Sequence, residues 1–220
     1  MRSYAEIHAI AAARHGGDEA LESRLTRPLP PSDLAQIPED RWLAAFCRTI
    51  FAAGLNWTVV EKKWDGIEAA FRGFDVNACA MMDDVWLDAL LADTRVIRSG
   101  AKITAVRDNA VLFQDLRPQG GAPAVFADWP STDFAGLLDL LKSRGARLGG
   151  NTAAYALRSL GRDSYILSGD VTARLIAEGV IDKPASSKSA RRAVQAAFNI
   201  WMDQSGRSLT EISRTLAFSI

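Results

Sequence analysis

Apolar residues recur at intervals of three and four along most of this 220-residue chain, and the alternation typical of β-strands is nearly absent. Between Glu39 and Ala53, for example, this period places Trp42, Phe46 and Ile50 on one stripe. The same pattern predicts about ten helices. The clearest cover residues 39–53, 58–74, 83–91, 102–116, 131–145, 151–160, 170–178, 190–204 and the stretch after Ser208. The fold class is therefore expected to be all-α.

Local signals divide the chain further. Thr58 with Glu61, and Ser208 with Glu211, have the spacing of a capping box at a helix start. Residues 117–123 are rich in glycine and proline and are predicted to form a loop. Residues 1–38 contain four prolines and have the least readable pattern. We expect them to form an N-terminal arm that precedes a helical domain at 39–220.

Composition excludes several classes of protein. Lys plus Arg (26) equals Asp plus Glu (26), so a polyanionic partner would have to be met by a local patch. Two cysteines and two histidines are too few for a disulfide scaffold or a zinc site of the usual spacing. We expect no metal and no cofactor. No apolar run approaches bilayer length, and Glu6 and His8 interrupt the N-terminus too early for a signal peptide. The sequence thus predicts a cytoplasmic protein without a membrane partner.

Positive charge gathers in one region of this neutral chain. Residues 142–192 contain ten Lys or Arg against four Asp or Glu. A helix predicted to end at Gly145, a turn containing Arg147, and a second helix beginning at Asn151 form a helical hairpin at about 133–160. The first N–H groups of such a helix attract anions, so the hairpin predicts contacts to nucleic-acid phosphates. The alternative is ordinary helix packing with a solvated face.

Asp170 stands where the next helix is predicted to begin. As an N-cap it would lie beside free backbone N–H groups, which favour an ionised carboxylate. An ionised carboxylate in a cleft can stabilise a developing sugar cation or orient an attacking water. A purely structural cap is the alternative interpretation.

Two stretches resemble known enzymes. Arg147–Ala153 and Gly169–Leu175 are similar to motifs of the helix-hairpin-helix DNA glycosylases, which remove damaged bases from DNA. Ala53–Lys63, followed by Phe71–Val76 and Val96–Ala105, looks like the 3-methyladenine DNA glycosylase I branch of that superfamily. Together the two stretches span about residues 45–180, which is most of the body of the chain.

The resemblance implies a two-lobed helical DNA glycosylase fold with an active cleft between the lobes. Asp170 would be the catalytic carboxylate, and Trp57 would stack on the extruded base in a pocket that includes Thr49 and Asn56. The residues implied to bind DNA phosphates are Arg147, Gly149, Gly150, Asn151 and Thr152.

The expected reaction follows from the same resemblance. Bifunctional relatives carry a Schiff-base lysine at the position of Asn151, so the activity here should be monofunctional. The substrate would be double-stranded DNA containing a damaged base, most readily an alkylated purine, and the protein should act as a monomer.

The chain also departs from the branch. The branch closes its termini with a zinc held by Cys and His, which the C-terminal part of this chain lacks, so no metal is expected. Thr49 replaces a Glu that helps to read the alkylated base. These departures leave open a second hypothesis, a catalytically inactive helix-hairpin-helix module that binds DNA or protein. The motif around Asp170 favours the enzyme.

Overall fold

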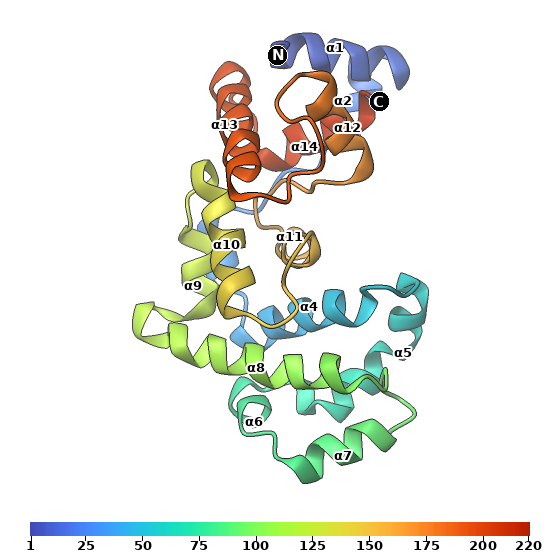
Figure 1. Cartoon of the computed structure of the whole chain (residues 1–220), viewed down its shortest axis with the longest axis vertical. Coiled ribbons are helices and arrows are strands. Elements are labelled where there is room, and N and C mark those ends of the chain that lie inside the picture. The colour runs from blue at the N-terminus through green and yellow to red at the C-terminus, as the bar shows by residue number, and fades with distance from the viewer. The chain divides into compact units, whose positions relative to one another are not determined.

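The computed structural model describes residues 1–220 and consists of α-helices, three short 3-10 helices and no strand (Figure 1). The all-α prediction is confirmed, with more and shorter helices than expected. The α-helices are α1 (Tyr4–Arg14), α2 (Asp18–Glu22), α3 (Pro31–Ala35), α4 (Glu39–Ala52), α5 (Trp57–Ala70), α6 (Val76–Ala80), α7 (Asp84–Ala92), α8 (Gly100–Leu116), α9 (Gly121–Asp128), α10 (Phe134–Arg144), α11 (Thr152–Ser159), α12 (Gly169–Ala177), α13 (Lys188–Ser205) and α14 (Leu209–Phe218). None of these helices is long and apolar enough to cross a bilayer.

The chain forms two compact units that do not follow chain order. The terminal unit consists of Met1–Leu29, Trp129–Leu137 and Asp163–Ile220. The central unit consists of Pro30–Asp128 and Leu138–Arg162. Each unit has its own buried aromatic cluster.

The core of the central unit is built around α4. Phe46 of α4 stacks on Phe126 of α9 and meets Phe113 of α8 edge-on, with ring centroids 5.6 Å apart in both pairs. Trp42, one helical turn earlier, lies 5.6 Å from Phe126. Burial of each large apolar side chain stabilises the fold by about 2 kcal/mol. The apolar stripe read from the sequence is therefore the face that packs α4 against α8, α9 and α11.

The terminal unit is arranged around α14, which contacts α1, α12 and α13. Tyr165 packs between Phe134 and Phe198, with centroid distances of 4.9 and 4.5 Å. Tyr4 of α1 shares a 3.0 Å hydrogen bond with the Thr215 hydroxyl of α14. Residues near the start of the chain, whose pattern was the least readable, thus belong to the core of this unit.

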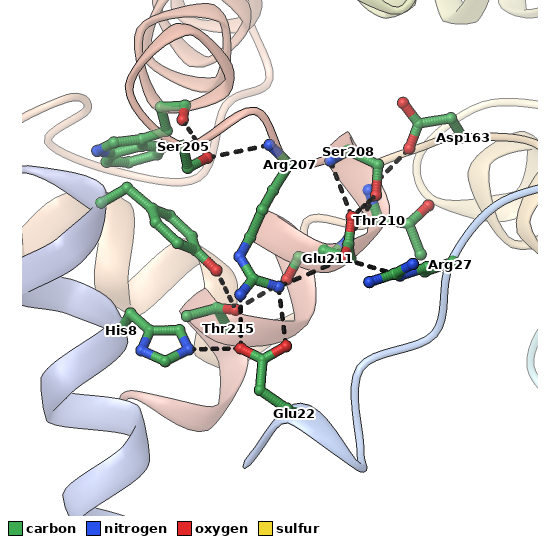
Figure 2. A network of polar contacts seen from close by, with 12 residues as sticks. His8, Glu22, Arg27, Asp163, Ser205, Arg207, Ser208, Thr210, Glu211 and Thr215 are labelled. Atoms are coloured by element: carbon green, nitrogen blue, oxygen red, sulfur yellow. Dashed lines mark hydrogen bonds and ion pairs between the residues drawn. The ribbon is translucent and has the colours of Figure 1, made fainter. Parts of the chain in front are cut away.

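The helix caps confirm one sequence prediction and correct another. Ser208 and Glu211 form the predicted capping box at the start of α14 (Figure 2). The predicted box of Thr58 with Glu61 is wrong, because α5 begins one residue before Thr58. Asn56 is its N-cap, and the Asn56 side chain accepts from the Thr58 N–H at 3.0 Å.

Candidate functional site

The predicted helical hairpin consists of α10, a turn at 145–151 and α11; the turn and α11 belong to the central unit, whereas α10 begins in the terminal unit, which includes residues up to Leu137. The turn requires glycine at Gly145, where a Cβ would lie 2.5 Å from Leu148 Cδ1 and 2.7 Å from the Leu141 carbonyl oxygen. Gly150 follows with a φ of +60°. Asn151 is the N-cap residue of α11, and Thr152 is its first residue. The backbone of the turn therefore bends as the glycine-rich sequence predicted.

Arg147 is held in the turn in the left-handed region, with a φ of +59°. This conformation costs a non-glycine residue about 1 kcal/mol. The side chain is exposed and has no hydrogen bond or ion pair within the protein. Lys142 is also exposed, and its side chain lies beside Gly149. Two cations are thus presented at the turn without an acidic partner.

Lys102 connects α8 to the end of α4, a role that the sequence did not reveal. Its buried ammonium group donates to the carbonyls of Phe51 and Ala53, at 2.9 and 2.7 Å. Burial, and second the nearby Arg147 guanidinium, lower the pKa of Lys102 below its usual 10.5. Arg147 therefore lies close to the point where α4 ends.

The residues after α4 include two members of the predicted base pocket. Gly54 turns the chain with a φ of +76°, and α5 begins at Trp57. Trp57 is 44% exposed and is therefore not a core residue. Asn56 is occupied as the helix cap, where its Oδ1 also accepts from the Thr58 hydroxyl at 2.9 Å. The structure thus brings Trp57 and the hairpin to the same end of α4.

Thr49 belongs to the interior of α4. It is buried, and its hydroxyl donates to the Phe46 carbonyl oxygen at 2.8 Å. The single hydroxyl proton is satisfied within the helix. In this conformation Thr49 can only accept a hydrogen bond from a base through its hydroxyl oxygen, or contact the base through its methyl group.

Asp170 lies in the terminal unit, and its predicted position as an N-cap is wrong. Ser168 is the N-cap of α12, and its Oγ accepts from the Val171 N–H at 3.2 Å. Asp170 is the second residue of the helix, exposed and without a hydrogen-bond partner in the protein. Because it does not serve as the cap, its carboxylate is free to act on a ligand in the positive field of the helix start.

The segment before Asp170 is fixed to the start of α14. The Asp163 carboxylate accepts from the Thr210 N–H at 2.9 Å (Figure 2). The N–H groups of Ser164 and Ile166 donate to the hydroxyls of Thr210 and Ser213, each at 3.1 Å. This extended segment therefore has its polar groups paired to α14, which holds the Ser168 cap and Asp170 in place.

The cysteines offer no alternative chemistry. Cys47 and Cys79 are buried free thiols, and burial raises the pKa of Cys79 to about 12. Both are therefore protonated at neutral pH and are poor nucleophiles. No group of three or more His, Cys, Asp or Glu side chains is placed to hold a metal ion.

Comparison with known proteins adds three findings. Residues 37–130 match the model of the methyladenine glycosylase family. The chain is 30% identical over 124 residues to DNA-3-methyladenine glycosylase 1 of Escherichia coli K12, covering 47% of this chain and 66% of that protein. It is 34% identical over 68 residues to DNA-3-methyladenine glycosylase of Haemophilus influenzae, covering 31% and 37%. The chain thus spans less than two thirds of these relatives.

The fold is also similar to that of a solved structure. The 3-methyladenine DNA glycosylase I of Staphylococcus aureus superimposes with a TM-score of 0.51 at 17% identity. The match covers 73% of this chain and 95% of that one. At this identity the likeness concerns the fold alone.

Proposed function

We propose that the chain, whose residues 37–130 match the methyladenine glycosylase family, is a monofunctional DNA glycosylase that releases alkylated purines from double-stranded DNA. The observation that carries the proposal is the family match. It covers α4, the turn at Gly54 and the exposed Trp57 at the start of α5.

The hairpin supports the DNA-binding part of the proposal. Arg147 and Lys142 present two cations without acidic partners, and the backbone N–H groups near Gly149 and Gly150 precede a helix start. Phosphate oxygens are bound by groups of these two kinds without regard to base sequence. The hairpin would hold the duplex while the damaged nucleotide rotates out of the stack, which costs least at a lesion.

The chemistry proposed for Asp170 follows from its charge. Breaking the N-glycosidic bond leaves positive charge on the deoxyribose, and a free carboxylate stabilises that charge while water attacks. An alkylated purine leaves as a neutral base from a cationic precursor, so little acid catalysis is needed. Asn151 cannot form a Schiff base, so the reaction would leave the strand intact.

The test is direct measurement of released bases. Double-stranded DNA treated with a methylating agent is incubated with excess protein, and 3-methyladenine, 7-methylguanine and strand breaks are quantified. We expect release of 3-methyladenine without strand cleavage. Duplex binding without release of any base would instead support the inactive helix-hairpin-helix module, and the absence of both would reject the DNA-directed function altogether.

A further inference from the structure

The basic region recognised in the sequence is divided by the fold into groups with different roles. Arg162 is buried and donates to the Phe126 carbonyl oxygen. Arg174 is also buried and donates to the Ser219 hydroxyl. Arg144 pairs with Asp115. The exposed cations without a partner in the protein fall in two places: Lys142 and Arg147 at the hairpin, and Lys183, Lys188 and Arg192 in the terminal unit. The second group has no role in the function proposed above.

The α12–α13 patch consists of Lys183, in the connection between α12 and α13, and of Lys188 and Arg192, in the first two turns of α13. Gly179 ends α12 with a φ of +69°, and the Val180 N–H returns to the Leu175 carbonyl oxygen at 3.0 Å. The Ser186 N–H then bonds to the Pro184 carbonyl oxygen at 2.8 Å. The start of α13 is capped by Ser187, so the unpaired cations, and not the helix terminus, are the free groups here.

A hollow of about 790 Å³ lies beside these cations, within the terminal unit. Its apolar wall includes Ile176, Val180 and Ile181, and its polar wall includes the hydroxyl-bearing Ser186 and Ser189. Lys183 and Asp182 also line the hollow, and Asp182 is the one acidic residue between 179 and 193. Hydroxyls and long cationic side chains around a concave surface suit a chain of phosphates separated by sugars.

We infer that the α12–α13 patch is a second DNA-backbone contact, which binds phosphates of the duplex flanking the lesion. The inference rests on the proposed function, because it takes the ligand to be lesion-containing duplex DNA. The position of the patch relative to Asp170 sets its distance from the extruded nucleotide. The seven residues of α12 that follow Asp170, Val171–Ala177, span about 11 Å at 1.5 Å per residue, and the patch begins beyond them. Because base pairs rise by about 3.4 Å, the contact falls about three base pairs from the extruded nucleotide.

The experiment compares the parent with Lys188→Ser/Arg192→Ser on two duplexes that contain one methylated base. One duplex extends ten base pairs on both sides of the lesion. The other extends only two base pairs on one side, and it is made in two versions so that each side is shortened in turn. Affinity is measured from 0.05 to 0.3 M salt. On the long duplex the variant should bind about fiftyfold more weakly at 0.1 M salt, and its log–log salt slope should be shallower by about two. On the duplex shortened on the contacted side, parent and variant should bind equally.

The control is Arg14→Ser/Arg27→Ser, which removes the same charge from exposed positions of the terminal unit outside the patch. It should keep the parental salt slope. An equal loss of duplex affinity in both double variants, or no loss of affinity in the patch variant, would overturn the inference. So would loss of binding to phosphatidylserine vesicles without any effect on DNA.

Failure of the proposed glycosylase function and failure of the patch are distinguished because they are measured by different experiments. The patch is tested by affinity and salt slope, whereas the glycosylase is tested by base release. A parent that binds duplex through the patch but releases no base would leave the patch standing and reject the enzyme. A parent that does not bind duplex would reject the patch.

Discussion

Asn109 and Ala146 form a reciprocal pair of hydrogen bonds that joins α8 to the hairpin turn. Asn109 Nδ2 donates to the Ala146 carbonyl oxygen at 3.0 Å, and the Ala146 N–H donates to Asn109 Oδ1 at 2.9 Å. Asn109 is completely buried. A side-chain amide is suited to this task, because it offers one donor and one acceptor side by side. The residue next to Arg147 is thereby fixed to the core.

Asn109→Ala should loosen the hairpin. The substitution leaves the donor and acceptor of Ala146 without their partner, which should cost about 2 kcal/mol of unfolding free energy in urea. Duplex binding should weaken further, because the conformation of Arg147 depends on the turn. Asp108→Asn, at the exposed neighbouring position, is the control and should change neither quantity. Equal stability of Asn109→Ala and the parent would contradict the stabilising role of the Asn109–Ala146 hydrogen bonds.

Arg147 should show opposite requirements for stability and binding. Arg147→Gly relieves the positive φ, so the unfolding free energy should stay within about 1 kcal/mol of the parent. Affinity for any duplex should fall about eightfold at 0.1 M salt, and the log–log salt slope should become shallower by about one. Arg147→Glu should weaken binding more, equally for all sequences. An unchanged salt slope in both variants would remove Arg147 from the DNA interface.

Asp170→Asn separates catalysis from folding. Because Ser168 is the cap, the change removes only the interaction of the carboxylate with the helix dipole, about 0.5 kcal/mol. If Asp170 stabilises the sugar cation, single-turnover release of a neutral damaged base should fall by about a hundredfold or more, while duplex binding persists or tightens. Asp203→Asn, another exposed aspartate of the terminal unit, should retain full activity. Equal rates for Asp170→Asn and the parent on both cationic and neutral lesions would end its catalytic assignment.

Glu178 should make the terminal unit sensitive to acid. Its buried carboxylate accepts from the Arg2 N–H at 2.7 Å and from the guanidiniums of Arg2 and Arg174. Burial alone would raise the pKa of Glu178, but these hydrogen bonds lower it below 4.5. A depressed folded-state pKa contributes stability above the unfolded pKa, and this contribution is lost as pH falls through the folded value.

Glu178→Ala should therefore cost about 3 kcal/mol at pH 7, because it leaves the buried Arg174 without its carboxylate. Glu178→Gln should cost less and should flatten the dependence of unfolding free energy on pH below about 4.5. The matched control is Glu19→Gln, at an exposed carboxylate of α2. Parallel pH profiles for Glu178→Gln and the parent would show that Glu178 is not the group responsible.

Chelation should leave the protein folded. The hypothesis of a metal-free fold predicts the same thermal unfolding midpoint before and after dialysis against EDTA, because no cluster of ligands is available to bind zinc. Elemental analysis should find no stoichiometric metal. Stoichiometric zinc whose removal unfolds the chain would contradict the prediction.

Local features of the sequence determined the fold class and several helix ends. Apolar spacing is a property of neighbouring turns, so the stripe of Trp42 and Phe46 in α4 could be read without knowing its partners. Ser208 and Glu211 complete their capping box within four residues, and that prediction is confirmed. The glycines of the hairpin likewise marked the turn at which Arg147 lies.

Tertiary structure decided which polar groups remain available. A residue's partner can lie anywhere in the chain: Arg174 bonds to Ser219, and Lys102 bonds to the end of α4, so neither is a free cation. Asp170 is free because Ser168 takes the cap, in a segment held by the side chains of α14. Local charge counts cannot register such long-range pairing. The sequence therefore indicated where the charged residues are concentrated, and burial and pairing in three dimensions decided which of them face a ligand.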